Sequence, residues 1–382
     1  MIENVKIIDC HIHYALPVDP KEIIDVMKQT NTDWANLVIV PHRQRISSVP
    51  DALMVKMMYP KQISVFGSLD VTQYFLHQKS LGKHFVTYVK RMMACGCDGI
   101  KMIEGKPQMR KTIPIPDFDS KVWDPFWEYA QVSKLPILWH VNDPEEFWDI
   151  NKIPSWAKAR GWFYDKTVVN NEDQYRQVIN VLNKYPLLKI TFAHFFFMSA
   201  QLPRLAALFD RFPNISVDLT PGIEMYINLS KTKEEAQAFF IKYQDRIMYG
   251  TDIGARSVLS DSTIHIDSKE SLRRCEIVKA FLENEEEFLI QADGNFLIGT
   301  DDFSLRGLGL EESVKRKIYA DNFQNFIGGK INPVSPKMVI QECHRLKLMI
   351  KIMSIFDKTI IVDYSYLNQV EKYFKSILCS KK

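Results

Sequence analysis

The sequence predicts an α/β fold, and within that class a closed barrel of eight parallel strands surrounded by helices. Two observations predict it. Short runs rich in β-branched residues recur from residue 5 to residue 249, and helical patterns alternate with them. Strands that alternate with helices of about 10–15 residues form right-handed βαβ units and a parallel sheet. Eight such strands fit a closed barrel better than an open sheet.

The eight predicted strands are short and mostly apolar. They are Val5–Asp9, Leu37–Val40, Ile63–Gly67, Gly99–Ile103, Pro136–His140, Lys189–His194, Ile215–Leu219 and Arg246–Tyr249. An open doubly wound sheet is the alternative. Such a sheet normally binds a nucleotide at a glycine-rich turn, and the sequence contains neither G-x-G-x-x-G nor G-x-x-x-x-G-K-[ST].

Helical patterns fill the segments between the strands. They are Lys21–Asn31, Val49–Tyr59, Lys79–Ala94, Val122–Ser133, Glu172–Lys184, Gln201–Phe212 and Lys233–Tyr243. Asp19-Pro20 before the first helix, and Asn170 with Asn171 before the fifth, are typical of helix N-termini.

The barrel is predicted to occupy residues 1–330, and an extension residues 331–382. Residues 260–299 are polar and have the pattern of an insertion, with a helix near Lys269–Glu283, and Glu311–Gly328 is predicted to be a closing helix. The mainly helical extension contains the helix Met338–Ser354, the strand-like run Thr359–Val362 and the amphipathic segment Leu367–Leu378. Three roles are open for it: capping the barrel, covering the site, or forming a homodimer contact.

The composition is typical of a soluble globular protein. The 382 residues are 46% apolar and 25% charged, and 49 basic against 46 acidic residues leave a net charge of +3. This balance gives no field that would attract nucleic acid or an anionic membrane, so neither is expected as a partner. No secretory leader and no apolar run of 18 residues are apparent, and the six cysteines are scattered. A reducing cytoplasm is therefore the expected location.

Two histidines follow the first strand and are separated by one residue. Side chains two apart on a strand point to the same face, so His11 and His13 are expected to converge on the mouth of the barrel. Their backbones would lie about 6–7 Å apart, which allows both imidazoles to bind one divalent ion.

Three more polar side chains stand at the ends of other predicted strands. His140 and His194 each end an apolar run, and Asp252 follows the run that ends in Tyr249-Gly250-Thr251. Barrel enzymes place their catalytic groups at the C-terminal ends of the strands. A lone histidine is more often a core residue than a ligand, but this joint placement predicts a metal site formed by His11, His13, His140 and Asp252.

The motifs that carry these residues resemble those of the amidohydrolase superfamily, in its amidohydrolase-related branch. The segments are IIDCHIHYAL, LPILWHVNDPEEFWD, KITFAHFFF, RIMYGTDIG and VKRKIYADNFQNFIG, in the order and spacing of that branch. The resemblance implies a distorted (β/α)₈ barrel with one or two metal ions at its mouth. It also implies that Asp252 binds the metal and accepts a proton, and that His194 polarises the scissile carbonyl or stabilises the oxyanion unless it binds a second ion.

Two positions of the match stay open. Members of the superfamily with two metals bridge them at the fourth strand by a carboxylated lysine or a glutamate, and this sequence offers both Lys101 and Glu104. Glu104 lies nearer the strand end and is the tentative ligand. The signature Gly-Thr-Asp also recurs at Asp301, but the fuller RIMYGTD match favours Asp252.

The resemblance implies a metal-dependent hydrolase that acts on an amide, ester or lactone bond of a small molecule. Imidazole and carboxylate ligands suit Zn²⁺ best, with Mn²⁺, Fe²⁺ or Co²⁺ as alternatives. A non-oxidative decarboxylase of an unsaturated or aromatic acid would use the same residues, and a barrel that only binds is the third alternative. Lys106, Arg256 and Tyr14 are tentative substrate-binding residues, and Arg110 could also bind a carboxylate.

Overall fold

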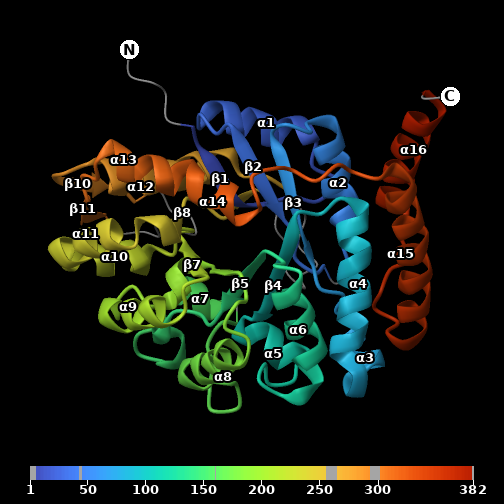
Figure 1. Cartoon of the computed structure of the whole chain (residues 1–382), viewed down its shortest axis with the longest axis horizontal. Coiled ribbons are helices and arrows are strands. Elements are labelled where there is room, and N and C mark those ends of the chain that lie inside the picture. The colour runs from blue at the N-terminus through green and yellow to red at the C-terminus, as the bar shows by residue number, and fades with distance from the viewer. Residues whose placement is uncertain (1–5, 43–44, 160, 255–264, 293–301, 381–382) are drawn as a thin grey trace.

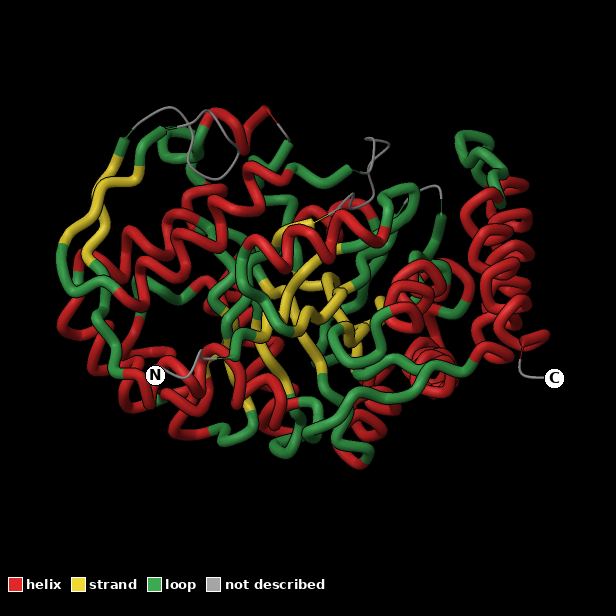
Figure 2. Tube along the Cα trace, turned by 90° about the horizontal axis from the view of Figure 1, so that it is seen from above, coloured by secondary structure: helices red, strands yellow, loops and turns green. Residues whose placement is uncertain are grey.

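The computed structural model describes residues 6–42, 45–159, 161–254, 265–292 and 302–380. Parallel strands form its centre and helices surround them (Figures 1 and 2). The strands pair in the order β8-β7-β6-β5-β4-β3-β2-β1-β9. Their bounds are β1 Ile8–His13, β2 Trp34–Val38, β3 Ile63–Ser68, β4 Gly99–Gly105, β5 Ile137–Val141, β6 Ile190–Phe192, β7 Ile215–Asp218, β8 Ile247–Met248 and β9 Ile253–Gly254.

The strands β8 and β9 are two parts of one interrupted eighth strand, and together they close the barrel. β8 pairs with β7, whereas β9 pairs with β1. Between them, the backbone N–H of Cys10 donates to Tyr249 O at 3.0 Å, and that of Asp252 donates to His11 O at 2.9 Å. The predicted eight-stranded parallel barrel is therefore confirmed, and its eighth strand is interrupted at residues 249–252.

The seven helices predicted between the strands are present. They are α1 Pro20–Gln29, α2 Val49–Met58, α4 Leu81–Cys95, α6 Asp124–Val132, α8 Asn171–Lys184, α9 Leu202–Arg211 and α11 Lys233–Lys242. The first begins as its sequence predicts. Asp19 caps the helix, Glu22 completes the capping box, and Pro20 occupies the first turn.

Shorter helical segments were not predicted, and most lie in the connections that follow strands. The α-helices are α3 Gln73–Leu76, α5 Pro107–Thr112, α7 Ser155–Ala159 and α10 Ile223–Lys231. The 3₁₀ segments are η1 Gln78–Ser80, η2 Lys121–Trp123, η3 Glu145–Trp148, η4 His194–Phe197 and η5 Gln244–Arg246.

A helical segment closes the N-terminal end of the barrel. α13 Glu312–Arg316 and α14 Asn322–Phe326 are joined by the π-helical turn η6 Lys317–Asp321, where the closing helix was predicted. Phe323 packs against Trp34 and Phe66, with ring centroids 5.8 Å and 6.0 Å apart. The aromatic plug leaves the opposite end, where the strands finish, for a functional site.

The segment predicted as an insertion holds the helix α12 Ser268–Glu283, as expected, and part of a hairpin that was not predicted. The hairpin pairs β10 Glu287–Ile290 with β11 Phe303–Arg306. Residues 260–264 and 293–299 of the predicted insertion lie outside the described residues.

The C-terminal extension is a helical hairpin of α15 Pro336–Phe356 and α16 Ser365–Ser380, packed against α2 and α4 (Figure 1). The prediction of a strand-like run at Thr359–Val362 is wrong. This run belongs to the connection between the two helices, where it forms no strand and Ile361 and Val362 are exposed. β-Propensity expresses how well a side chain fits a half-buried sheet surface, so it does not make a strand of an exposed connection.

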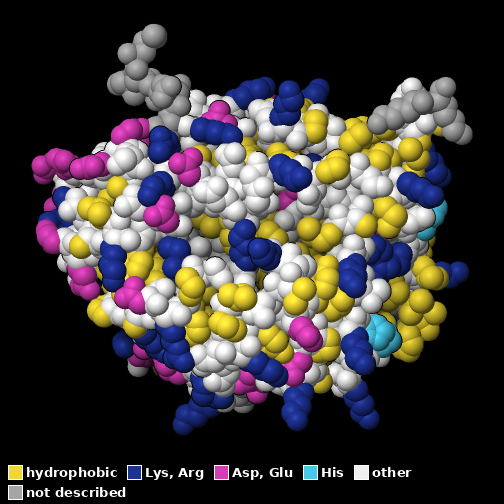
Figure 3. Space-filling view, in the orientation of Figure 1, with side chains coloured by type: hydrophobic (Ala, Val, Ile, Leu, Met, Phe, Trp, Pro, Cys, Tyr) yellow, Lys and Arg dark blue, Asp and Glu magenta, His cyan; other side chains and the backbone are white. Residues whose placement is uncertain are grey.

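Apolar side chains gather along the edge of the molecule formed by these two helices (Figure 3). The large exposed ones are Leu348, Ile355, Phe356, Ile361, Val362 and Leu378. Across the described segments, no helix combines the length and the apolar character needed to cross a bilayer.

Candidate metal centre

The structure brings His11, His13 and Asp252 together. Both histidines lie within β1, which runs further than predicted, and Asp252 lies in the break between β8 and β9. One ligand atom from each residue lies within 4.8 Å of the others. Asp252 Oδ1 is 2.9 Å from His13 Nε2 and 3.8 Å from His11 Nε2. Two imidazoles and a carboxylate at these separations fit a divalent metal ion.

The hydrogen bonds of the two rings decide which nitrogen faces Asp252. His11 Nδ1 is 2.9 Å from Asp218 Oδ2, and His13 Nδ1 is 3.1 Å from the carbonyl oxygen of Val38. Both partners are acceptors, so Nδ1 of His11 carries the proton in the neutral ring. His13 also has an acceptor at Nε2, Asp252 Oδ1 at 2.9 Å, so its Nδ1 carries the proton when a cation rather than a proton lies between Nε2 and Asp252. The Nε2 lone pairs are then directed to the centre, which is the arrangement that metal-binding histidines use.

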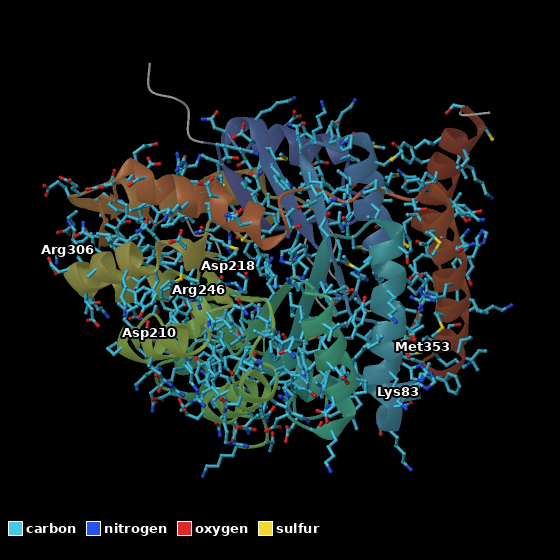
Figure 4. All side chains as sticks on the ribbon, viewed as in Figure 1. Lys83, Asp210, Asp218, Arg246, Arg306 and Met353 are labelled. Atoms are coloured by element: carbon cyan, nitrogen blue, oxygen red, sulfur yellow. The ribbon has the colours of Figure 1, made fainter. Side chains whose placement is uncertain are left out.

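Asp218 was not predicted as a site residue. It ends β7 at the centre of the molecule (Figure 4), and besides His11 it contacts His194 and Thr220. Its Oδ1 accepts hydrogen bonds from the backbone N–H of His194 at 2.8 Å and from the hydroxyl of Thr220. A carboxylate at the end of a predicted strand, here after Ile215-Ser216-Val217, is the same signal that pointed to Asp252.

His194 and His140 lie beside this group. The ring centroid of His194 is 5.9 Å from that of His11 and 4.8 Å from that of His140. His194 begins a left-handed turn, η4, in which residues 194–197 all have φ between 53° and 58°. Such a run costs about 1–2 kcal/mol per residue, and it persists only where surrounding contacts fix it.

Burial keeps these histidines neutral. It lowers the pKa of His11 and of His194 well below the usual value for the side chain. For His140, burial outweighs the nearby Asp143 and lowers the pKa to about 4. Neutral imidazole is the form that binds a metal, so the buried position favours ligation over protonation.

At the fourth strand, Lys101 rather than Glu104 reaches the centre. Lys101 Nζ lies 3.2 Å from His11 Nε2, and burial lowers the pKa of Lys101 to about 8. The strand register shifts between Met102 and Gly105. Glu104 lies beside Tyr74, and burial raises the pKa of its carboxyl to about 7. Glu104 does not join the three-residue group found among the described residues.

Lys106 lies at the rim of the site. Its Nζ is 2.7 Å and 2.9 Å from the two carboxylate oxygens of Asp143 and 4.4 Å from the ring centroid of Trp162. Asp143 also accepts a hydrogen bond from Tyr164 and lies 3.4 Å from His140 Nε2. Burial opposes ionisation of Asp143, but the lysine and histidine outweigh it and hold the pKa well below its ordinary value.

The other tentative residues have different placements. The hydroxyl of Tyr14 donates to Val18 O at 2.7 Å, and the side chain is buried. Arg110 contacts Asp117 and Gln177. Arg256 and Asp301 lie outside the described residues.

A sequence model of the amidohydrolase family matches residues 85–322, more than half of the chain. The chain therefore belongs to the amidohydrolase family, and it is an enzyme of that family. Members are typically metal-dependent, which agrees with the donor set of His11, His13 and Asp252. No curated protein matches the chain.

Several solved structures share the fold. An amidohydrolase II has a TM-score of 0.51 at 13% identity, covering 84% of this chain and 99% of its own. An uncharacterised TIM-barrel protein from Bordetella bronchiseptica has a TM-score of 0.52 at 12% identity, with coverages of 85% and 99%. A putative amidohydrolase from Staphylococcus aureus has a TM-score of 0.50 at 15% identity, with the same coverages. At such identities the likeness concerns the fold alone.

Proposed function

We propose that this protein is a metal-dependent hydrolase that cleaves an amide, ester or lactone bond of a small molecule. The observation that carries the proposal is the group of His11, His13 and Asp252, whose ligand atoms lie within 4.8 Å of one another where barrel strands end. Active sites of barrel enzymes occupy that end.

His11, His13 and Asp252 would hold the metal, and His140 would complete the set. Zn²⁺ suits these ligands best, with Mn²⁺, Fe²⁺ and Co²⁺ as alternatives. A divalent metal in such a site lowers the pKa of a bound water to about 7 and polarises a carbonyl oxygen. If a second ion binds, Lys101 in its carboxylated form would be a better candidate than Glu104 for the ligand shared by the two ions. Its Nζ lies 3.2 Å from His11 Nε2.

Two side chains would manage protons. Asp252 faces both histidines and could accept a proton from the attacking water and pass it to the leaving group. His194 Nδ1 lies 3.2 Å from the carbonyl oxygen of Thr220, so Nδ1 carries the proton and Nε2 a lone pair. This favours His194 as a ligand or a proton acceptor over a hydrogen-bond donor to an oxyanion.

Non-oxidative decarboxylation is the alternative, and the surroundings of His140 and His194 favour it in one respect. The Phe197 ring lies 5.2 Å from that of His194, and the ammonium of Lys106 lies over Trp162. Aromatic surfaces beside a cation suit a flat carboxylic acid. Lys106 is thus a candidate for binding a substrate carboxylate in either reaction, provided that the substrate shares or displaces its contact with Asp143.

The test combines metal analysis with two activity assays. The purified protein is expected to contain divalent metal, and to lose it in the variants His11→Ala and His13→Ala. His344→Gln, at an exposed histidine that pairs with Glu371, is the matched control. Turnover of lactones, esters or amides supports hydrolysis, whereas CO₂ release from aromatic or unsaturated acids supports decarboxylation. A metal-free protein with neither activity would favour a barrel that only binds.

A further inference from the structure

The guanidinium of Arg274, on α12, lies beside the carboxylate of Asp252. Arg274 Nη1 is 3.6 Å from Asp252 Oδ2, and only 1% of the arginine is exposed. A buried guanidinium needs acceptors for its fork of N–H groups, so its contacts show what it holds in place.

Those contacts join three separate segments. Nη1 is 3.3 Å from Pro221 O in the loop after β7, and 3.5 Å from Thr251 O in the break of the eighth strand. Nε donates to Glu270 Oε1 at 2.8 Å, one turn earlier on α12. One side chain therefore anchors α12 to the loops after β7 and β8.

Asp252 needs such an anchor because its backbone is strained. Its φ is 56°, in the left-handed region that non-glycine residues rarely adopt. On one side the Asp252 N–H donates to His11 O at 2.9 Å. On the other side Arg274 contacts the preceding carbonyl, of Thr251, and the Asp252 carboxylate itself.

The two oxygens of Asp252 have different surroundings. Oδ1 is 2.9 Å from His13 Nε2 and 3.8 Å from His11 Nε2, whereas Oδ2 is the oxygen near Arg274. The two oxygens of a carboxylate are chemically equivalent, so a half-turn that exchanges them leaves the site unchanged. The guanidinium, held by Glu270 and two backbone carbonyls, instead fixes the plane of the Asp252 carboxylate and keeps one of its oxygens directed at the histidines.

We propose that Arg274 is a positioning residue of the metal centre, which orients Asp252 so that Oδ1 faces the Nε2 atoms of His11 and His13. The inference rests on the metal site proposed above, and it gives α12 a role in the site. Residues that orient metal ligands typically contribute about 10–100-fold to metal affinity.

The experiment compares Arg274→Gln with Arg273→Gln, its neighbour on α12, which contacts Glu276 and Gln291 instead. Metal-free wild type and variants are titrated with Co²⁺, and the visible absorption of bound Co²⁺ reports the geometry of its ligands. Arg274→Gln is expected to weaken Co²⁺ binding by about 10–100-fold and to change the spectrum, while Arg273→Gln matches wild type. Arg274→Lys should restore binding only in part, because an ammonium lacks the planar fork.

Wild-type affinity and spectrum in folded Arg274→Gln would overturn the inference and leave the metal site standing. If wild type binds no Co²⁺, the metal site itself fails and the inference fails with it. If Arg274→Gln does not fold, Glu270→Ala decides, because it removes the carboxylate that accepts from Arg274 Nε. Weaker Co²⁺ binding in that variant supports the positioning role, and unchanged binding contradicts it.

Discussion

Asp218 holds the imidazole of His11 through a contact of 2.9 Å between Oδ2 and Nδ1, and both side chains are buried. The other oxygen of Asp218 accepts the backbone N–H of His194 at 2.8 Å. One carboxylate thus sets the orientation of one histidine ring and the start of the turn that carries another.

Asp218→Asn is expected to weaken metal binding by about 10–100-fold. An amide has one acceptor and one donor end, but Asp218 must accept at both ends. In the variant the NH₂ group faces either the backbone N–H of His194, which is a clash of two donors, or His11 Nδ1. In the second case Nδ1 becomes an acceptor and the ring proton moves to Nε2, the nitrogen that would bind the metal. Co²⁺ titration measures the loss. Asp210→Asn is the control, at a carboxylate that pairs with Lys242 and Tyr243, and an equal loss there would refute the explanation.

Because Phe197 lies in the left-handed turn η4, two variants at this position are expected to differ in stability. Phe197→Ala and Phe197→Gly both remove the ring that stacks on His194, but only glycine adopts a φ of 53° without strain. Phe197→Gly should be the more stable of the two by about 1 kcal/mol in urea unfolding. Equal stabilities would show that the turn relaxes once the ring is gone.

A buried ion pair joins the barrel to the segment that leads into the C-terminal hairpin. Lys56 Nζ lies 2.5 Å from Asp98 Oδ2, and Asp98 Oδ1 accepts the backbone N–H of Asn332 at 2.7 Å. Lys56→Met should lower the free energy of unfolding by about 3–5 kcal/mol, because it leaves Asp98 buried without its cation. Adding Asp98→Asn should recover part of that loss in urea unfolding. No recovery in the double variant would contradict the ion-pair explanation.

The contribution of Glu371 to the stability of the contact between α15 and α16 is expected to depend on pH. Partial burial opposes its ionisation, but Lys347, Lys375 and His344 outweigh that effect and lower the pKa from 4.5 to about 2. A carboxyl with a lowered pKa in the folded state adds stability above its unfolded pKa and loses it as the pH falls. Glu371→Gln should therefore be less stable than wild type at pH 7.

The difference in melting temperature between Glu371→Gln and wild type should narrow as the pH falls from 4.5 toward 2. A constant difference across that range would show that the charge of Glu371 is not the cause.

Much of the barrel could be predicted from the sequence, because apolar runs and helical patterns alternate regularly. The hairpin of β10 and β11 could not, since its strands are short and partly exposed. The run Thr359–Val362 shows the opposite error: its residues favour a strand, but they lie in a largely exposed connection between two helices.

At the site, the histidines at the ends of predicted strands could be recognised from the sequence. The directions in which side chains point could not. Lys101 pairs in regular register with Leu138 and reaches His11, whereas Glu104 lies in the register shift between Met102 and Gly105. No sequence pattern gives the position of such a shift. Arg274 was missed for a related reason. Its direction depends on how α12 packs against β9, which is a tertiary contact.

The two hydrogen bonds that fix Nδ1 of His11 and His13 have a further consequence. The rings need no rotation before an ion arrives, so metal entry carries little entropic cost from the ligands. A protein stripped by a chelator should then keep its fold and recover its metal on simple addition, in one fast step without a slow rearrangement.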